Sequence, residues 1–580
     1  MNESLKGVTV LELTRSVAGS YAGGLLAANG ATVHKIVSLP SDVTPFTCAH
    51  KKLHENDALM SLLLQPFQLI ITDSAMDLHT RTFVQRAKPH VLTCHLEIGN
   101  ALDSTEEVLQ AINGWSALTG DQEESALVIG GSPASVVIGA HIAFIATAAL
   151  YNDITERVTV YAEEVLASAL EGAATQYIAQ RAERRRYGNR HQGLIPMFIT
   201  KASDGYVFIG APTEDKWELL ARWAEIDEPA YASDEGRARN VKDVEARLAQ
   251  WAKTQTVDEL VVVGQAFRLP FAKVQTPQQL RECPQLQHRG YFKRRIPWKE
   301  TVLAEAAPTH KPLANLRILD LTSMWAGPYC SRLFADLGAE VIKIEAPTRP
   351  DGIRKGQNAA APFFQELNRN KRAITLNLQQ QEDRVQFELL VQNADVLIEN
   401  FSPRVMENFG YTPEALHRLN ERLHITSLSA FGQTGHYRDY IGYGPTLESF
   451  GGIASVTGYG ETPWLPGFSV SDFGAGIHGA AATMFALYGQ KTHGAVKRID
   501  VSQYEVAVNL LANALYEKVN KQRSLSASSL KTVCSRLVES QKIHGAFFYT
   551  CASLPTTITP APAIGEHDAH YKGCEKHATD

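Results

Sequence analysis

Residues 317–345 read RILDLTSMWAGPYCSRLFADLGAEVIKIE, and this stretch decides the fold. The apolar run 317–321 predicts a strand, and the Ala-Gly-Pro turn at 326–328 opens a helix. Gly338 ends that helix, and residues 341–344 predict the next strand. A strand, a helix and a strand in this order form a β-α-β unit, in which the strands are parallel and the crossover is right-handed.

The same pattern occurs earlier in the chain, at residues 9–37, as TVLELTRSVAGSYAGGLLAANGATVHKIV. Laid against 317–345 without gaps, 13 of 29 positions are identical, at an offset of 308 residues. That offset is too long for a solenoid repeat, so it indicates a duplicated domain. The sequence therefore predicts an α/β protein with two related large domains in one chain.

The division of the rest follows from changes in composition. A charged connector at 181–191 precedes a segment with a hairpin signal at Ser203-Asp204-Gly205, and a proline-containing linker follows. The predicted parts are a diverged first large domain (1–188), a small α+β domain (189–303), a linker (304–315), a second large domain (316–520), and a tail that returns to the large domain (521–580).

The tail contains a short motif that is similar to one at the end of the predicted small domain. HGAFF at 544–548 resembles HRGYF at 288–292, but too few residues precede it for a second small domain. We interpret the second small domain as missing, which leaves a truncated or mis-spliced product as one explanation.

Composition excludes several classes of protein. The 580 residues carry a net charge of −6, with no basic excess that would favour nucleic acid. The seven cysteines show no C-x-x-C spacing, so neither a zinc site nor a disulfide framework is expected, and no metal is predicted. The N-terminus has no signal-peptide pattern, and the apolar run 140–150 is too short to span a bilayer. We expect a cytoplasmic enzyme.

Two acidic residues near helix starts could carry chemistry. In RIDVSQYEVAVNLL, at 498–511, Glu505 follows a buried strand, where it is either an ordinary first-turn acid or a carboxylate nucleophile. Asp472, in SVSDFGAG, is interpreted as a plain N-cap. The turn at 322–328 could cradle a phosphate, but without a G-x-G-x-x-G pattern we do not expect NAD.

Taken together, the motifs resemble a known family. They are L-x-D-L-T, A-G-P, L-x-D-L-G-A-E-V-I-K-I-E, N-R-N-K-R, A-D-V-L-I-E-N-F, G-Q-T-G and R-I-D-V-S-Q-Y-E, all within about 312–516. This set is similar to the class III CoA-transferases, which include formyl-CoA transferase, carnitine CoA-transferase and α-methylacyl-CoA racemase. The resemblance implies a Rossmann-like large domain, a small domain, and two units threaded through each other, with CoA between the large domain of one and the small domain of the other.

The resemblance also implies site residues. The family's aspartate nucleophile, placed one turn into the last helix, falls on Glu505, and on Glu164 in the first copy. Glutamate is one methylene longer, so a working nucleophile there requires a compensating change. The implied CoA contacts are Trp325, Ala326, Leu376, Asn377, Leu378, Gln379, Asn400, Phe401, Ser402 and Tyr443.

The implied activity is CoA transfer between an acyl-CoA thioester and a carboxylic acid, through an anhydride on the enzyme carboxylate. No permanently bound cofactor is expected, since coenzyme A and acyl-CoA are substrates. The alternatives are an inactive CoA-binding or scaffold protein and a racemase or lyase, although Tyr443 stands where the racemases have a histidine base.

We further expect a pseudo-dimer within the chain or a homodimer, without nucleic acid or membrane partners. The first copy lacks sequence counterparts of N-R-N-K-R and E-N-F, so one competent site per chain is predicted.

Overall fold

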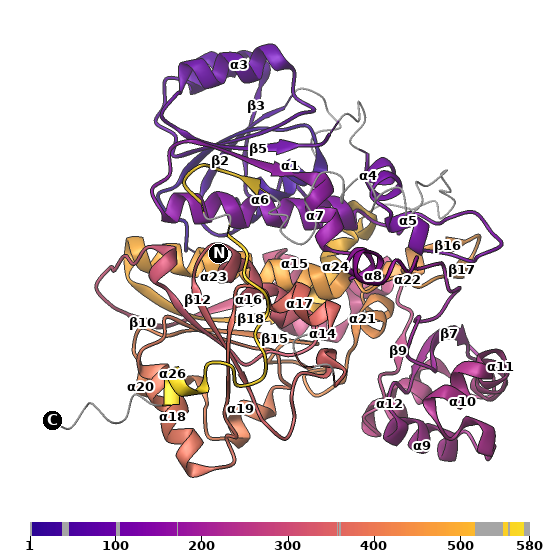
Figure 1. Cartoon of the computed structure of the whole chain (residues 1–580). Helices are drawn as coiled ribbons and strands as arrows, with labels where there is room; N and C mark the ends of the chain where they lie inside the picture. The colour runs from indigo at the N-terminus through magenta and orange to yellow at the C-terminus, as the bar shows by residue number, and fades with distance from the viewer. Residues whose placement is uncertain are drawn as a thin grey trace.

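The structure is a computed structural model of the whole chain. It describes residues 3–37, 44, 46–99, 105–170, 172–356, 358, 361–516, 549–554 and 557–572. The polar segment 521–538 and the HGAFF motif lie outside the described residues. Figure 1 shows two large α/β domains stacked one above the other, with the small domain at one side.

The first large domain is built on a seven-stranded sheet. Its strand order is β19-β6-β5-β4-β1-β2-β3, and every pair is parallel except β19 with β6. The strands are β1 (Thr9–Leu13), β2 (Thr32–Val37), β3 (Lys52–Glu55), β4 (Leu69–Asp73), β5 (Leu92–Glu97), β6 (Arg157–Tyr161) and β19 (Tyr549–Thr550). The apolar residues of the inner strands β1, β4 and β5 are buried, as expected where helices cover a parallel sheet, whereas the edge strand β3 is largely exposed.

The second large domain repeats this sheet, in the order β10-β18-β15-β14-β11-β12-β13. Here β10 is the antiparallel edge strand, paired with β18. The strands are β10 (Trp298–Glu305), β11 (Arg317–Asp320), β12 (Glu340–Glu345), β13 (Arg372–Thr375), β14 (Val396–Glu399), β15 (His424–Ser429) and β18 (Ala495–Ser502). The predicted β-α-β unit is present as β11, helix α16 (Ala326–Asp336) and β12.

The two halves exchange their edge strands. Strand β10 follows the small domain in sequence but belongs to the second sheet, whereas β19 follows the second large domain and belongs to the first sheet. The chain therefore passes from each half into the other. This differs from the predicted boundary at residue 303, because β10 pairs with β18 and is not part of the small domain.

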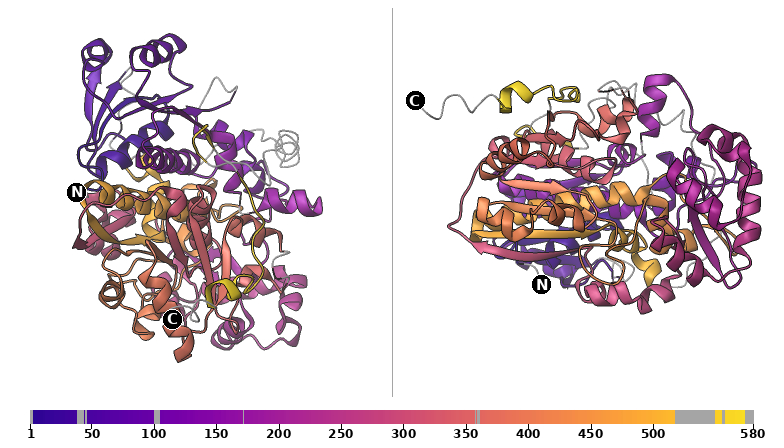
Figure 2. Two further views of the ribbon diagram at one scale, coloured as in Figure 1. Left: turned by 60° about the vertical axis from the view of Figure 1, so that its left-hand side comes forward. Right: turned by 90° about the horizontal axis from the view of Figure 1, so that it is seen from below.

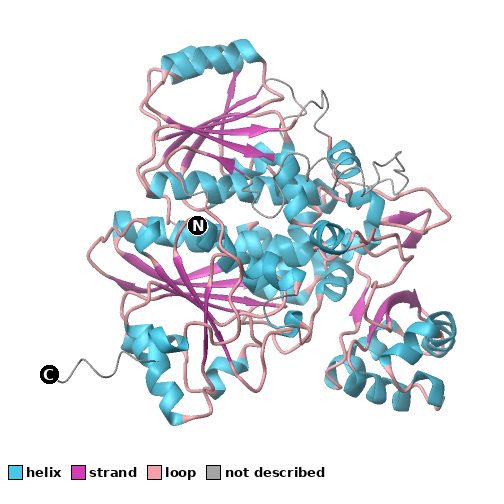
Figure 3. Ribbon diagram, viewed as in Figure 1, coloured by secondary structure: helices cyan, strands magenta, loops and turns pink. Residues whose placement is uncertain are grey.

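Two apolar helices form the interface between the sheets. Helices α6 (Pro133–Tyr151) and α23 (Val470–His493) pack against each other, and Figure 3 shows the helix layer between the two sheets. Helix α6 is long and apolar enough to cross a membrane by composition, but 94% of that stretch is buried inside the fold. Helix α6 is therefore a buried core helix between the two large domains.

Glycines allow the close approach in this layer at equivalent places. A Cβ on Gly139 would lie 2.4 Å from the Ala18 carbonyl oxygen of α1 (Val17–Ala28). A Cβ on Gly476 would lie 2.7 Å from the Ala326 carbonyl oxygen of α16. The matching contacts show that α6 corresponds to α23 and α1 to α16.

The small domain lies at one end of the molecule, as both views of Figure 2 show. It contains an antiparallel sheet of β7 (Met197–Lys201), β8 (Tyr206–Gly210) and β9 (Ala272–Lys273), so the hairpin expected at residues 203–205 is confirmed. Its helices α9 (Glu214–Trp223), α11 (Val241–Ala252) and α12 (Val257–Ala266) cover the sheet.

The last described segment of the tail, residues 557–572, lies at the open edge of the second sheet. The Asp568 side chain accepts hydrogen bonds from the Thr375 backbone N–H (2.7 Å) and hydroxyl (2.6 Å), and Tyr571 donates to Glu340. The short helix α26 (Asp568–Lys572) thus covers the end of β13. No described segment pairs with the free edge of β3 in the first sheet.

Candidate active site

A cavity of about 490 Å³ opens between the small domain and the second large domain. It lies at the carboxyl ends of the parallel strands β11 and β14, where open α/β sheets bind ligands. Six of the predicted contact residues line it, and they are Trp325, Ala326, Asn400, Phe401, Ser402 and Tyr443. The small domain contributes Lys216 from α9, Arg268 from the turn after α12, and residues at and just before the start of β7.

The turn before α16 is fixed by the residue that ends the neighbouring strand. Asn400 Oδ1 accepts a hydrogen bond from the Ser323 N–H (3.0 Å), and Asn400 Nδ2 donates to the Ser323 carbonyl oxygen (2.8 Å). Asp351 accepts from the N–H of Met324, whose φ of 69° places it in the left-handed region. These hydrogen bonds fix the backbone position of Ser323 and Met324, which line the cavity.

The predicted contacts at 376–379 do not line this cavity. They follow β13 at the same edge of the sheet, but Leu376 and Leu378 are buried in the apolar cluster around α18 (Gln381–Gln392). The Asn377 N–H donates to Asp383, and the Gln379 N–H donates to the Asn377 side chain. This segment therefore forms a turn beside the site.

The cavity carries mostly positive charge. Its lining contains four cationic side chains, two from the small domain and two from the second large domain, and they are Lys216, Arg268, Arg349 and Arg438. Asp472 is the one carboxylate among the lining residues. Such a lining favours an anionic ligand, and phosphate groups in particular.

Asp472 lies in the first turn of α23, half-buried, and it is not the N-cap that the sequence predicts. Ser469 is the N-cap, and its side chain makes no capping hydrogen bond. A Cβ on Gly444 would lie 2.9 Å from Asp472 Oδ2 and 2.3 Å from Ser469 Oγ, so the 442–445 loop approaches Asp472 closely only because residue 444 is glycine. The helix dipole favours an anion here.

Glu505 has a different environment from the one expected of a nucleophile. It is fully buried in α24 (Gln503–Leu510) and is not among the residues that line the cavity. Arg289 Nε donates to Glu505 Oε1 (2.8 Å), and Arg294 Nη2 donates to Glu505 Oε2 (2.8 Å). Both carboxylate oxygens are therefore held by guanidinium groups, and its sequence neighbour Gln503 reaches the cavity instead.

The G-Q-T-G and HRGYF motifs meet at this ion cluster. Arg289 also donates to Asp500 (2.7 Å), and a Cβ on Gly432 would lie 2.1 Å from its guanidinium nitrogen. Gln285 donates to the carbonyl oxygens of Phe431 and Thr434. These motifs thus dock helix α14 (Pro284–Arg289) on the second large domain, a role that motif spacing alone does not reveal.

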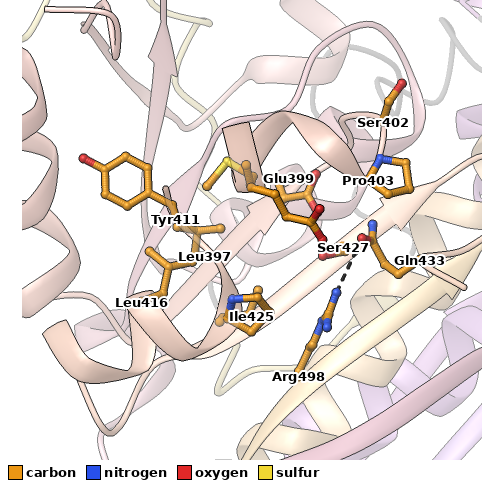
Figure 4. Close-up of a pocket in the computed structure, with 13 residues that line it drawn as sticks. Leu397, Glu399, Ser402, Pro403, Tyr411, Leu416, Ile425, Ser427, Gln433 and Arg498 are labelled. Carbon is orange, nitrogen blue, oxygen red and sulfur yellow. Dashed lines mark hydrogen bonds between the residues drawn. The ribbon is translucent and has the colours of Figure 1, made fainter. Parts of the chain in front are cut away.

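A second, much smaller cavity of about 20 Å³ lies behind the 400–402 segment. Figure 4 shows Glu399 and Ser427 beside it, with Arg498 and Gln433 joined by a 3.4 Å hydrogen bond. Glu399 is 5% exposed, and its carboxylate accepts from the Phe401 N–H at 2.8 Å. Burial raises the pKa of Glu399 to about 7, against the lowering effect of its hydrogen bonds and of Arg498.

Comparison with known proteins decides the family. A sequence model described as CoA-transferase family III matches residues 100–309 and 313–548, which together exceed half of the chain. The chain belongs to CoA-transferase family III. The match in two segments confirms both the resemblance and the tandem duplication, and the α/β fold agrees with it.

The chain is also similar to proteins that are named as CoA-transferases. The chain is 34% identical over 267 residues to succinyl-CoA–D-citramalate CoA-transferase of Chloroflexus aurantiacus, covering 44% of this chain and 65% of that protein. It is 35% identical over 206 residues to formyl-CoA:oxalate CoA-transferase of Streptomyces avermitilis, covering 34% and 50%. The chain thus matches about half to two thirds of the length of these relatives.

Among solved structures, a CaiB/BaiF family protein from Brucella suis aligns with a TM-score of 0.34 and 32% identity. The alignment covers 35% of this chain and 56% of that chain.

The two copies of the family III fold differ at the site. Asp472 is the third residue of α23, and the third residue of α6 is Ser135. Ser135 donates its N–H and its hydroxyl to Glu106 at the start of α4 (Glu106–Ile112), where the second copy has Gly444. The first copy therefore has no carboxylate at the Asp472 position, and Glu106 occupies the space that Gly444 leaves open.

Other elements of the site are retained in the first copy, contrary to the sequence comparison. Lys51 pairs with the buried Glu12 (2.7 Å), as Lys371 of the N-R-N-K-R motif pairs with Asp320 (2.9 Å). Asp73 accepts from the Arg15 N–H (3.0 Å), as Asn400 accepts from the N–H of Ser323, the residue equivalent to Arg15. One residue of each motif, Lys371 and Asn400, therefore has a spatial counterpart in the first copy, but the spacing along the chain differs, which hides both in an ungapped comparison.

Proposed function

We propose that the chain transfers CoA between an acyl-CoA thioester and a carboxylic acid, with Asp472 as the nucleophile. The observation that carries this is the position of Asp472: its carboxylate lines a cation-rich cavity between the small domain and the second large domain, at a helix N-terminus. The proposal moves the nucleophile from Glu505, whose two oxygens are engaged by Arg289 and Arg294.

The chemistry needs only a carboxylate and the two substrates. An Asp472 oxygen attacks the thioester carbonyl carbon, the carbon–sulfur bond breaks, and CoA leaves as a thiolate, which leaves a mixed anhydride on Asp472. The thiolate then attacks the Asp472 carbonyl, which releases the donor acid and leaves an aspartyl thioester. The acceptor carboxylate then attacks the aspartyl thioester and releases the CoA thiolate, which forms a second mixed anhydride. The thiolate attacks the acyl carbon of the acceptor in this anhydride, which forms the new thioester and frees the Asp472 carboxylate.

The charges around Asp472 support this use. Four cationic side chains in the lining match the phosphates of CoA, which lets binding energy from the nucleotide part position the thioester. The family III relatives named above act on succinyl-CoA and formyl-CoA, so we infer a small acyl group for this chain as well.

A single site per chain follows from the contrast between the copies. Ser135 cannot form an anhydride, and the Glu106 carboxylate already binds the first turn of α6. We expect calorimetric titration with CoA to give one site per chain, and two equal sites would contradict this.

The racemase alternative finds no support at Tyr443. Burial raises the pKa of the Tyr443 hydroxyl, so this side chain is protonated at neutral pH and is a poor base for an α-proton.

Trapping of the covalent intermediate tests the proposal. The wild type and Asp472→Asn are mixed with acyl-CoA, treated with hydroxylamine or borohydride, and analysed by peptide mass spectrometry. We expect a mass change on the peptide that contains Asp472, and none in Asp472→Asn. CoA binding without any adduct would indicate a binding protein, and an adduct on Glu505 would restore the sequence-based assignment.

A further inference from the structure

We propose that Glu448 is a positioning residue for Asp472, acting through Ser471. This inference rests on the proposed function, because it assigns Asp472 the role of nucleophile. Glu448 lies in α21 (Gly444–Phe450), which packs against α23, and its side chain is fully buried.

Glu448 binds the residue next to Asp472 in two ways. Its Oε1 accepts hydrogen bonds from the Ser471 backbone N–H (3.2 Å) and from the Ser471 hydroxyl (3.2 Å). The Ser471 hydroxyl also lies 3.3 Å from the Gly444 carbonyl oxygen. One buried carboxylate therefore ties the first turn of α23 to the loop that faces Asp472.

A negative charge at position 448 is favoured by the electrostatics of the α23 N-terminus. The first N–H groups of α23 have no partner within the helix, and the helix N-terminus carries partial positive charge. Burial of an isolated carboxylate is unfavourable, and the hydrogen bonds from Ser471 reduce that cost for Glu448. A neutral apolar residue at position 448 would leave the Ser471 N–H buried without this acceptor.

In the first copy a different acid binds the equivalent helix start. Its acid is Glu106, the first residue of α4, and it accepts hydrogen bonds from the Ala134 and Ser135 N–H groups. Gln110 stands at the position of Glu448, as the fifth residue of its helix, and it bonds to the backbone of Ile129 instead.

In the second copy the acid lies one turn further along the equivalent helix, because Glu106 is the first residue of α4 and Glu448 is the fifth residue of α21. With glycine at 444 and glutamate at 448, the first turn of α23 is held from behind, and no side chain at 444 stands over Asp472. The difference in the position of the acid leaves the start of α6 covered by Glu106 of α4, whereas the start of α23 can present the Asp472 carboxylate to a substrate. A displacement of the nucleophile by about 1 Å can cost on the order of 10²-fold in rate.

The test compares Glu448→Gln and Glu448→Ala. The amide oxygen of glutamine can accept both bonds from Ser471, so we expect the single-turnover acylation rate of Glu448→Gln to stay within about threefold of the wild type. In Glu448→Ala we expect it to fall about 10²-fold, with the Kd for CoA changed less than about twofold. Gln110→Ala is the matched control, since it removes an equally buried polar side chain from the copy without a nucleophile.

Each outcome bears on the inference. A folded Glu448→Ala with wild-type acylation would overturn it, as would an equal loss of acylation in Gln110→Ala. If Glu448→Ala does not fold, Glu448→Asp provides the test, because the shorter side chain withdraws the acceptor while retaining the charge, and an unchanged rate would contradict positioning. Failure of the proposed function itself is distinguished by Asp472→Asn, which would then form adduct.

Discussion

Arg289 Nε lies 2.8 Å from Glu505 Oε1, and both side chains are fully buried. The pair joins α14, at the end of the small domain, to α24 in the second large domain. Burial by itself lowers the pKa of Arg289, but the carboxylates of Glu505 and Asp500 outweigh it, and the net shift is upward. We therefore expect Glu505 to stabilise the fold through this ion pair.

The first prediction separates this structural role from catalysis. Loss of one partner of a buried ion pair leaves an uncompensated charge and typically costs 3–5 kcal/mol. We expect Glu505→Gln to lower the free energy of unfolding by an amount of about this size, measured by urea denaturation, yet still to form the acyl adduct on Asp472 at low temperature. Arg294→Ala, which removes the more exposed partner, serves as the milder control. A stable Glu505→Gln that forms no adduct would point back to Glu505 as the nucleophile.

The second prediction concerns Gly444. A methyl group there would lie 2.5 Å from Ser469 Cβ and 2.9 Å from Asp472 Oδ2, so one of these side chains must move. We expect Gly444→Ala to reduce kcat by about 10²-fold, because the nucleophile is displaced. Gly193→Ala is the control, since a Cβ at Gly193 meets nothing within 4 Å. Equal activity of the two variants would show that the approach of this loop is not needed.

Much of the fold could be predicted from short-range pattern alone. The Ala-Gly-Pro turn, the apolar strands and the glycines that end helices are local features, and their recurrence at residues 9–37 revealed the duplication. The exchange of β10 and β19 could not be predicted, because an edge strand carries no mark of the sheet that it joins. The sheet that an edge strand joins is determined by the strand with which it pairs, and that strand is distant in sequence.

The site shows the same limit. Asp472 and Glu505 are both acids in the first turn of a helix, and no local feature tells them apart. They differ in their partners. Arg289, 216 residues before Glu505, donates a hydrogen bond to Glu505, whereas Asp472 lines the cavity. The counterpart of the N-R-N-K-R lysine in the first copy was missed for a related reason, because Lys51 matches Lys371 in space and not at the offset of the repeat.

The third prediction is a pH dependence of stability that originates at Glu399. Its pKa of about 7 in the folded protein exceeds the ordinary value of 4.5, so between these values the folded state binds more protons than the unfolded state. Its contribution is therefore fully present below about pH 4.5 and is lost as the pH rises through about 7, by on the order of 3 kcal/mol.

Denaturation of the wild type and Glu399→Gln between pH 5 and pH 8 measures this effect. We expect the wild type to lose stability relative to Glu399→Gln as the pH rises, since the amide resembles the protonated acid. Arg498 and Asp500 face Glu399 from β18 and act in opposite directions on its carboxylate, and both are present in the variant. A difference between the two proteins that stays constant with pH would contradict the assignment.

The fourth prediction uses two equivalent hydrogen bonds that cross between the halves. His478 Nδ1 lies 2.6 Å from the Gly474 carbonyl oxygen and must donate to it, so Nε2 accepts from the hydroxyl of Tyr21 (2.7 Å). His141 in α6 makes the corresponding pair, with Val137 O at Nδ1 (2.8 Å) and the Tyr329 hydroxyl at Nε2 (2.9 Å). Burial lowers the pKa of His478 to about 4 and that of His141 to about 3, consistent with neutral rings.

Tyr21→Phe and Tyr329→Phe should therefore destabilise the protein to a similar extent. Each variant removes a hydroxyl that donates to a histidine. Tyr21→Phe also removes the acceptor of the Asn509 amide, and Tyr329→Phe also removes the hydroxyl that lies 2.8 Å from Ser168 Oγ. We therefore expect a loss of roughly 1–3 kcal/mol per buried group left unpaired. Because each bond joins one half to the other, unfolding in urea should remain a single transition that shifts as a whole. Tyr161→Phe, at the exposed contact with Thr550, is the control and should change little. A large loss in only one of the two buried variants would show that the halves are not held together equivalently.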